Sequence, residues 1–300
     1  MKFHNTIKNA GLLSNDPRLA FKKRVYGFYN IETILLSGRN PKPVDLLDIS
    51  LHPLSSINIP ETYFDSAERI LIDSRLSESV LKQEKSEKNK NKFIEACLLR
   101  NWGPVKKIRE YKNNNYFGDL TSLRVFWHTP MQKICNKKKY LTAELPDLLD
   151  ICIYISGSRL VNLYIEQTGK EGFFALAELE GNIIAELSVN KNLPASLKPL
   201  YGLHTYFTEG AATNIPLSGH MNTDGVLEAH DDSFVYLAPE NNLWEISPAE
   251  ENLFLHMIGA INAGNYSSDI SENYQSLCAA CSRAFASGEK SSYPEGHPKQ

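Results

Sequence analysis

Short apolar runs alternate with helix-forming segments over roughly the first hundred residues. Residues 44–51, 70–73 and 93–99 are mostly apolar and are bounded by polar or turn-forming residues, which predicts buried strands. Helices are predicted between these runs. The first has Asp16 at its cap and Pro17 at its first helical position, and the others cover residues 31–37, 60–67 and 105–111. Strands that alternate with helices are typical of an α/β domain with a parallel sheet.

The pattern changes from Gly118 onwards, where strand-like runs follow one another. These runs cover residues 120–129, 161–168, 173–179, 183–189, 201–208, 226–229 and 233–237. Consecutive strands separated by turn residues predict a largely antiparallel sheet. Helices are predicted over residues 145–156, ended by Gly157, and over two closing segments, from Ser247 to Gly264 and over residues 271–285.

These two patterns predict two domains and a tail. An α/β domain is expected over residues 1–117, and an α+β domain built on one large, mostly antiparallel sheet is expected over residues 118–287. Residues 288–300 are rich in Gly, Ser, Pro and charged side chains, which predicts a flexible tail.

Composition and charge narrow the classes of protein. The 300 residues are 42% apolar and 22% charged, and their net charge is -3, which gives no reason to expect a nucleic acid or an anionic membrane as partner. No apolar run approaches the roughly 20 residues that span a bilayer, and the N-terminus lacks the apolar core of a signal peptide. An odd set of five cysteines favours free thiols and the cytoplasm.

Two groups of residues are of the types that bind metals, but their spacing does not match that of a metal-binding motif. Residues 228–232 (EAHDD) follow His204 and His220, yet their spacing matches no zinc motif, and residues 231–233 are more simply a turn between two strands. Cys278 and Cys281 form a C-x-x-C inside an apolar helix, where packing is expected rather than redox or metal chemistry. The sequence therefore predicts no metal site.

Several local motifs occur in an order that points to a known family. A strand reading roughly D-x-V-x-I-x-T-P is similar to residues 44–51 (VDLLDISL), and G-K-H-V-L-x-E-K-P-L is similar to residues 67–76 (AERILIDSRL). Residues 117–125 look like the motif G-x-I-G-x-I-x-x-V, with which the family's C-terminal domain begins. Residues 147–157 match the family's helix H-x-x-D…G, and residues 247–288 look like its closing pair of helices. The chain resembles the glucose–fructose oxidoreductase/inositol dehydrogenase (Gfo/Idh/MocA) family, whose members bind NAD(P) on an N-terminal Rossmann domain.

This chain departs from the family pattern at positions that the family uses for cofactor binding and catalysis. No G-x-G-x-x-G occurs in the sequence, and the chain is expected to enter at the second strand, around residues 11–13. The first domain is therefore predicted to be a truncated Rossmann-like domain without the first βα unit, although an incomplete reading frame would give the same pattern. The family's lysine falls on Ser74 and its proline on Arg75, while its histidine falls on Asp147; Asp150 matches the helix aspartate.

The resemblance assigns candidate site residues. The candidates for catalysis are Arg75, Asp147 and Asp150, those for contact with a cofactor are His52, Asp73 and Ser74, and those for contact with substrate are Arg100 and Trp102. Asp147 and Asp150 share a helix face, so they form either an acid/base pair with raised pKa values or a solvated or capping pair. Arg100 either binds an anionic group or forms a structural ion pair.

Three functions remain open from the sequence. The first is a catalytically degenerate protein that serves as a partner or regulatory subunit, because the glycine loop, the lysine and the histidine are absent together. The second is an active NAD(P)-dependent reductase of a small carbonyl, imine or sugar-like compound, and the third is a small-ligand-binding protein. The resemblance also implies a homo-oligomer, or a hetero-oligomer with a full-length paralogue.

Overall fold

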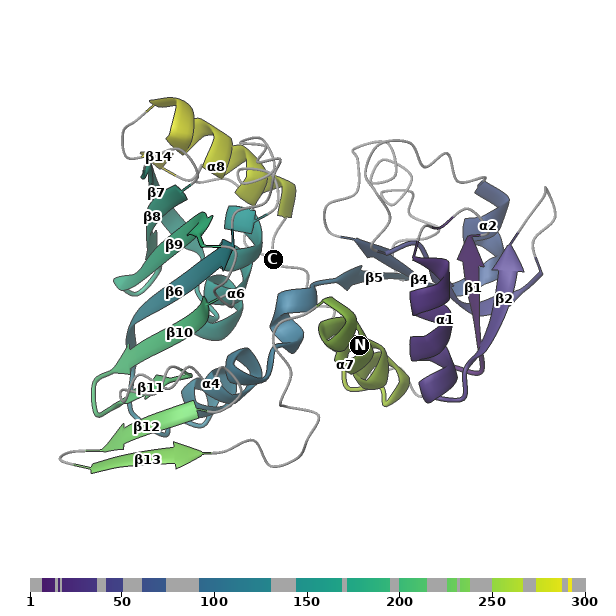
Figure 1. The fold of residues 1–300 in the computed structure, drawn as a ribbon, viewed down its shortest axis with the longest axis horizontal. Helices are drawn as coiled ribbons and strands as arrows, with labels where there is room; N and C mark the ends of the chain where they lie inside the picture. Colours follow the sequence, from purple (N-terminus) through teal and green to yellow (C-terminus); the bar gives the residue numbers. More distant parts are fainter. Residues whose placement is uncertain are drawn as a thin grey trace. The chain divides into compact units, whose positions relative to one another are not determined.

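The computed structural model describes residues 7–13, 16, 18–36, 42–50, 61–73, 92–130, 144–168, 172–194, 200–214, 226–230, 233–237, 250–266, 274–287 and 291–292. The chain forms two compact units (Figure 1). The first consists of Met1–Leu98 with Glu250–Ile270, and the second of Leu99–Ala249 with Ser271–Gln300. The division thus falls before the boundary expected at residue 117, and a late segment of the chain belongs with the first unit.

The first unit contains a parallel five-stranded sheet. Its strands are β1 (Asn9–Leu13), β2 (Glu32–Leu36), β3 (Val44–Asp48), β4 (Ala67–Asp73) and β5 (Phe93–Ala96). They lie in the order β2-β1-β3-β4-β5, and each neighbouring pair is parallel. The strand order reverses between β1 and β3. In doubly wound sheets, ligands bind at the carboxyl ends of the strands at such a switch point.

This order is one strand shorter than the six-stranded order 3-2-1-4-5-6 of a complete Rossmann fold. Removing any one of the first three strands of that order gives the arrangement of the described strands. In each case β1 lies beside the switch point, so the turn that follows it is on the ligand side of the sheet.

The helix predicted over residues 31–37 is wrong, because Glu32–Leu36 forms strand β2. Each of its residues pairs with β1, from Asn9 opposite Glu32 to Leu13 opposite Leu36. A segment of five residues that ends in an apolar run can form either a helix or a strand by pattern alone. Here the pairing with β1 makes it a strand. The strand predicted over residues 93–99 is shorter than expected, because Leu98–Asn101 is a 3-10 helix, η1.

Helices cover both faces of the parallel sheet. On one face, α1 (Leu19–Phe28) and α7 (Glu250–Asn262) enclose a core with Leu12, Leu46 and Leu71, and the Phe254 ring lies 5.3 Å from that of Phe21. On the other face, α2 (Glu61–Ser66) packs through Tyr63 and Phe64. Helix α7 buries the apolar side that its spacing predicts, and this packing explains why residues 250–270 belong to the first unit.

The second unit contains a nine-stranded sheet in the order β13-β12-β11-β10-β6-β9-β8-β7-β14. Its strands are β6 (Leu120–Pro130), β7 (Leu160–Gln167), β8 (Gly172–Leu179), β9 (Ile183–Leu193), β10 (Leu200–Phe207), β11 (Ala211–Thr213), β12 (Val226–His230), β13 (Ser233–Leu237) and β14 (Ser291–Ser292). Among these described strands every pairing except β6–β9 is antiparallel, which confirms the mostly antiparallel sheet. The described part of the predicted tail, β14, pairs with β7.

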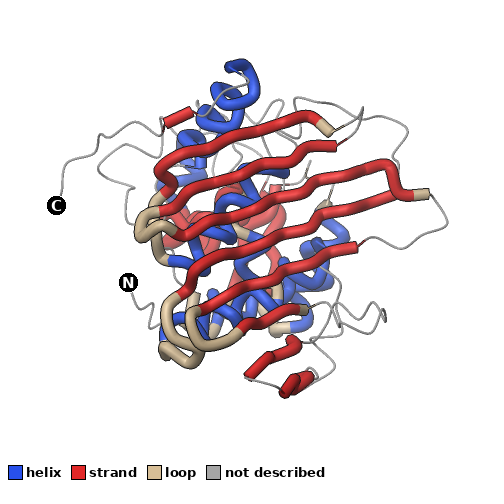
Figure 2. The backbone as a smooth tube through the Cα atoms, turned by 90° about the vertical axis from the view of Figure 1, so that its left-hand side faces the viewer, coloured by secondary structure: helices blue, strands red, loops and turns tan. Residues whose placement is uncertain are grey.

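Three helices pack on this sheet, namely α4 (Gly103–Asn113), α6 (Leu145–Ser156) and α8 (Tyr274–Ser287). They contact β10, β6, β9 and β7, and Figure 2 shows the strands of the sheet lying across the front of the view. Helix α6 has the bounds that the sequence predicts, and it ends at Gly157, whose φ of 67° lies in the left-handed region that favours glycine.

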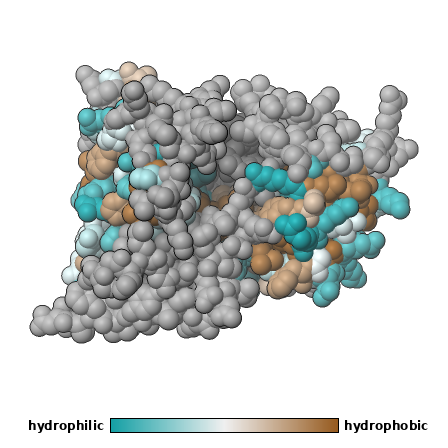
Figure 3. All heavy atoms as spheres, in the orientation of Figure 1, coloured by the Kyte–Doolittle hydropathy of each residue, from teal (hydrophilic) through white to brown (hydrophobic). Residues whose placement is uncertain are grey.

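On the face that Figure 3 shows, hydrophilic and hydrophobic side chains lie side by side among the coloured residues of each unit. Among the residues that the structure describes, no helix is both long and apolar enough to cross a membrane.

Candidate functional site

The turn that follows β1 carries Asp16 to the N-terminus of α1. The Asp16 N–H donates to the Leu13 carbonyl at 3.1 Å, the Leu19 N–H donates to the Asp16 carbonyl at 3.0 Å, and Asp16 Oδ1 accepts the Arg18 N–H at 2.8 Å. These bonds hold a carboxylate at the start of a helix, where the exposed N–H groups and the helix dipole favour an anion.

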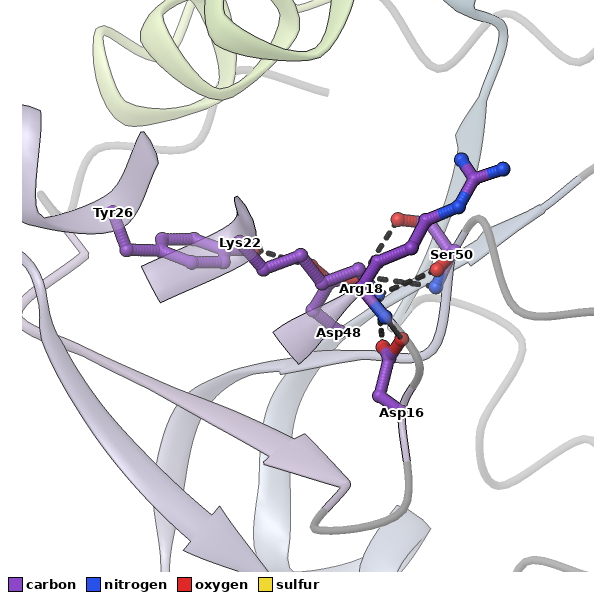
Figure 4. Close-up of polar contacts among 6 residues, drawn as sticks. All are labelled: Asp16, Arg18, Lys22, Tyr26, Asp48 and Ser50. Atoms are coloured by element: carbon purple, nitrogen blue, oxygen red, sulfur yellow. Dashed lines mark hydrogen bonds and ion pairs between the residues drawn. The ribbon is translucent and has the colours of Figure 1, made fainter. Parts of the chain in front are cut away.

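Lys22, in the first part of α1, joins this turn to strand β3 (Figure 4). Its Nζ lies 2.8 Å from Asp16 Oδ2 and 3.1 Å from Asp48 Oδ1, and it donates to the Ser50 carbonyl at 2.5 Å. The side chains of Lys22, Asp16 and Asp48 are 0% exposed. The buried ammonium thus donates hydrogen bonds to Asp48 and to the Ser50 carbonyl, and it forms an ion pair with Asp16.

Asp48, the last residue of β3, is the centre of this network. Its Oδ1 also accepts the Ser50 N–H at 2.9 Å and the Ser50 hydroxyl at 2.6 Å, and its Oδ2 accepts the Tyr26 hydroxyl at 2.8 Å. Burial and the Asp48 carboxylate raise the pKa of Tyr26 well above its ordinary value, so the phenol keeps the proton that it donates. We call Asp16, Lys22, Tyr26, Asp48 and Ser50 the Lys22 network.

The Lys22 network places a buried carboxylate at the N-terminus of α1. The network has two carboxylates and one ammonium, and Arg18, whose N–H binds Asp16, adds a cationic side chain to the same turn. In Rossmann folds the N-terminus of the helix after the first strand and its glycine-rich turn bind the pyrophosphate through backbone N–H groups, and α1 is that helix where β1 is the family's first strand. Here the Asp16 carboxylate takes the place of an anion at the helix, and a phosphate would meet like charge.

Sequence reasoning did not single out Lys22, Tyr26 or Asp48. Two signals could have identified them. Lys22 lies three and four residues before Val25 and Tyr26, which places a lysine on the buried face of α1, and Asp48 lies within an apolar strand. A lysine and an aspartate that are both expected inside the core predict that they pair with each other.

A second buried ion pair holds two of the predicted site residues. In the second unit, Arg100 Nε donates to Asp150 Oδ2 at 2.8 Å and Arg100 Nη2 donates to Asp150 Oδ1 at 2.6 Å. The two side chains are 8% and 6% exposed, and the Arg100 guanidinium also lies 4.9 Å from the centre of the Tyr154 ring. Of the two alternatives left open for Arg100, the structure shows the ion pair. Both oxygens of Asp150 are occupied, which disfavours its use as a base.

Of the other predicted site residues, the structure describes Asp147, Trp102 and Asp73. Asp147 lies half-buried in the first turn of α6, and its charge, after burial, helps raise the pKa of Cys278 on α8 to about 12. Trp102 is 1% exposed and precedes α4. Asp73 ends β4 at the carboxyl edge of the parallel sheet, whereas His52, Ser74 and Arg75 lie outside the described residues.

The described residues show no grouping of metal ligands. Within them, no three His, Cys, Asp or Glu side chains lie where they could hold a metal ion. Cys278 and Cys281 are free thiols of helix α8, and burial raises the pKa of both. The residues 231–232 lie outside the described part of the chain.

Comparison with known proteins rests on structure. No protein-family model matches the chain, and no curated protein matches it by sequence. A solved structure of levoglucosan dehydrogenase in complex with NADH matches with a TM-score of 0.67 at 15% identity, over 98% of this chain and 93% of that one. The chain has the fold of the Gfo/Idh/MocA-type oxidoreductases.

Two further structures show the same Gfo/Idh/MocA-type fold. The myo-inositol 2-dehydrogenase of Lactobacillus plantarum matches with a TM-score of 0.67 at 11% identity, over 97% of this chain and 100% of that one. A super-repressor mutant of Gal80p from Saccharomyces cerevisiae matches with a TM-score of 0.69 at 11% identity, over 96% and 98% of the two chains. The resemblance stated from the sequence is thus confirmed at the level of the fold.

Proposed function

We propose that this protein is a catalytically degenerate form of the Gfo/Idh/MocA-type fold that acts as a partner or regulatory subunit and does not use NAD(P). The Lys22 network carries this proposal, because it fills the anion position at the N-terminus of α1 with the chain's own Asp16 carboxylate. Opening that position would expose two carboxylates and one ammonium that are now fully buried.

The residues that correspond to the family's acid/base groups support the same proposal. The family lysine falls on Ser74, whose hydroxyl carries no charge, and the family histidine falls on Asp147. The matching aspartate, Asp150, is held by both nitrogens of a buried arginine fork. The first two differences remove a group that hydride-transfer chemistry would need for proton movement, and the ion pair engages the third.

One of the similar structures is that of a super-repressor mutant. Gal80p is described as carrying a super-repressor mutation, whereas levoglucosan dehydrogenase is described with NADH, so this fold occurs both in a repressor and in an oxidoreductase. A regulatory role therefore needs no departure from the fold.

The proposal extends to partners and location. We place the protein in the cytoplasm as a homo-oligomer or as a hetero-oligomer with a full-length paralogue. One candidate surface is the side of the nine-stranded sheet that carries Arg124, Leu176 and Tyr206, whose side chains are exposed while those of the alternate residues are buried.

The alternative function, an NAD(P)-dependent reductase of a small carbonyl, imine or sugar-like compound, requires cofactor binding.

Cofactor binding separates the two functions. Titration of the protein with NADH and with NADPH, followed by nucleotide fluorescence, is expected to show no saturable binding below about 100 μM, which corresponds to less than about 5.5 kcal/mol of binding free energy. Saturable binding of either nucleotide at micromolar concentration would favour the reductase and contradict the degenerate assignment.

A further inference from the structure

Strand β2 lies at one end of the parallel sheet of the first unit (Figure 1). Among the described strands it pairs with β1 alone, so its other edge has no neighbour there. The complete Rossmann order 3-2-1-4-5-6 has a further strand outside strand 2. Where β1 and β2 are strands 1 and 2, that outer strand is the one missing from the described sheet. The open edge of β2 is therefore a place where a strand can be added.

The hydrogen bonds to β1 show which backbone groups of β2 point towards the open edge. The Glu32 N–H donates to the Lys8 carbonyl at 2.9 Å, and the pairing continues without a shift to the end of β2. In a parallel pair, every second residue of a strand directs both its N–H and its C=O to the same neighbour. The backbone groups of Glu32 and Ile34 therefore point to β1, and those of Thr33 and Leu35 point to the open edge.

The side chains of β2 lack the features that keep edge strands from pairing with another chain. Leu35 is 45% exposed, and Thr33 and Ile34 are half-buried. Edge strands of soluble proteins are commonly protected by lysine, proline or a β-bulge, and residues 33–36 (TILL) contain none of these. The edge thus combines free backbone groups with an exposed apolar side chain.

Strand β2 is complementary to a second copy of itself. Two copies that meet antiparallel about a two-fold axis at Ile34 place Thr33 of each copy opposite Leu35 of the other. The outward N–H and C=O groups of these two residues then form four hydrogen bonds, which leaves none of the eight groups unpaired. The one charged residue of the strand, Glu32, lies opposite Leu36 and not opposite its own copy, so like charges do not meet.

We infer that the open edge of β2 pairs with β2 of a second copy of this chain, which joins the two parallel sheets into one continuous sheet. This inference names a surface for the homo-oligomer proposed above and rests on that part of the proposed function. The surface differs from the exposed side of the nine-stranded sheet, which belongs to the other unit. Pairing at this edge requires neither NADH nor NADPH, so the nucleotide titration and the tests below can fail independently.

The first test is the mass of the full chain by sedimentation equilibrium over micromolar concentrations, which is expected to show a dimer. Leu35→Lys should raise the dissociation constant of that dimer at least about tenfold, because each dimer loses two buried leucines and gains two charges at the joined edge. Leu176→Lys makes the same change at a residue of β8 that is 39% exposed, and the association should remain in that variant.

The second test is a disulfide cross-link that reports the register. In this arrangement the two Ile34 residues form a pair without mutual hydrogen bonds, with Cα atoms about 4.5 Å apart, which lies within the range of roughly 4.4–6.8 Å that a disulfide spans. Ile34→Cys should therefore give a covalent dimer on a non-reducing gel when diamide is added as the oxidant. Leu35→Cys is the matched control, because the two Leu35 Cα atoms are more than about 7 Å apart.

The unchanged protein, oxidised in parallel, controls for its own five cysteines, and thermal melts confirm that each variant folds. The inference is overturned if the unchanged protein is a monomer, if Leu35→Lys leaves the dissociation constant unchanged, or if Ile34→Cys cross-links no more than Leu35→Cys. A dimer that dissociates in Leu176→Lys but not in Leu35→Lys would keep the homo-oligomer and contradict the pairing of β2. Saturable nucleotide binding by a protein whose dimer depends on Leu35 would contradict the degenerate assignment and support the pairing.

Discussion

Replacing Lys22 by methionine is expected to lower the free energy of unfolding of the first unit by about 3–5 kcal/mol, because the substitution leaves Asp16 and Asp48 buried without their counter-ion. Methionine is similar in length, so the loss reports the missing charge rather than a large cavity. Chemical denaturation followed by circular dichroism measures the difference.

Lys23→Met is the matched control for this variant. Lys23 is the next residue of α1 and is exposed, so its replacement is expected to change the free energy of unfolding by less than about 0.5 kcal/mol. Equal losses in the two variants would show that the buried ion pairs do not hold the turn to strand β3.

The second large effect is expected from Arg100→Met in the second unit. This change leaves the Asp150 carboxylate, which is 6% exposed, without the two donors that now bind it, at a cost of about 3–5 kcal/mol in the free energy of unfolding. The same denaturation experiment measures it, with tertiary signal in the aromatic region of the circular dichroism spectrum as the reporter.

Arg109→Met provides the comparison within the same group of side chains. The Arg109 guanidinium lies 3.5 Å from the centre of the Tyr154 ring, whose other cation is Arg100, so this variant tests the cation–π contact without the ion pair to Asp150. Its expected cost is about 0.5–1 kcal/mol. If Arg100→Met cost no more free energy of unfolding than Arg109→Met, the Asp150 carboxylate would not need Arg100 as its counter-ion. That result would contradict the conclusion that Arg100 keeps Asp150 from acting as a base.

Much of the fold could be predicted from local pattern. The bounds of α6 follow from its apolar spacing and from Gly157, and the turn at Gly181-Asn182 has positive φ at both residues, 83° and 61°, as a tight hairpin turn between β8 and β9 requires. The β2 strand could not be predicted, because residues 31–37 fit helix and strand equally until β1 is placed beside them. The packing of α7 onto the first unit also depends on contacts between segments far apart in the sequence.

The candidate site was harder to predict for the same reason. The sequence shows that the glycine motif is absent, but not what replaces it. Lys22 and Asp48 are 26 residues apart and Arg100 and Asp150 are 50 apart, so each ion pair exists only after the helices dock on their sheets. The sequence placed Asp150 and Arg100 among the candidates and left a structural ion pair open for Arg100, but it did not show that Asp150 is the partner.

The most direct test of the central claim is hydrogen–deuterium exchange of the peptides that cover residues 12–28 and 44–50, measured with and without millimolar NADH and NADPH. If the Lys22 network occupies the phosphate position, exchange in these peptides should be slow without nucleotide and unchanged when either nucleotide is added. Nucleotide-dependent protection confined to these two segments would contradict the account, because it would show that the turn after β1 still binds the cofactor.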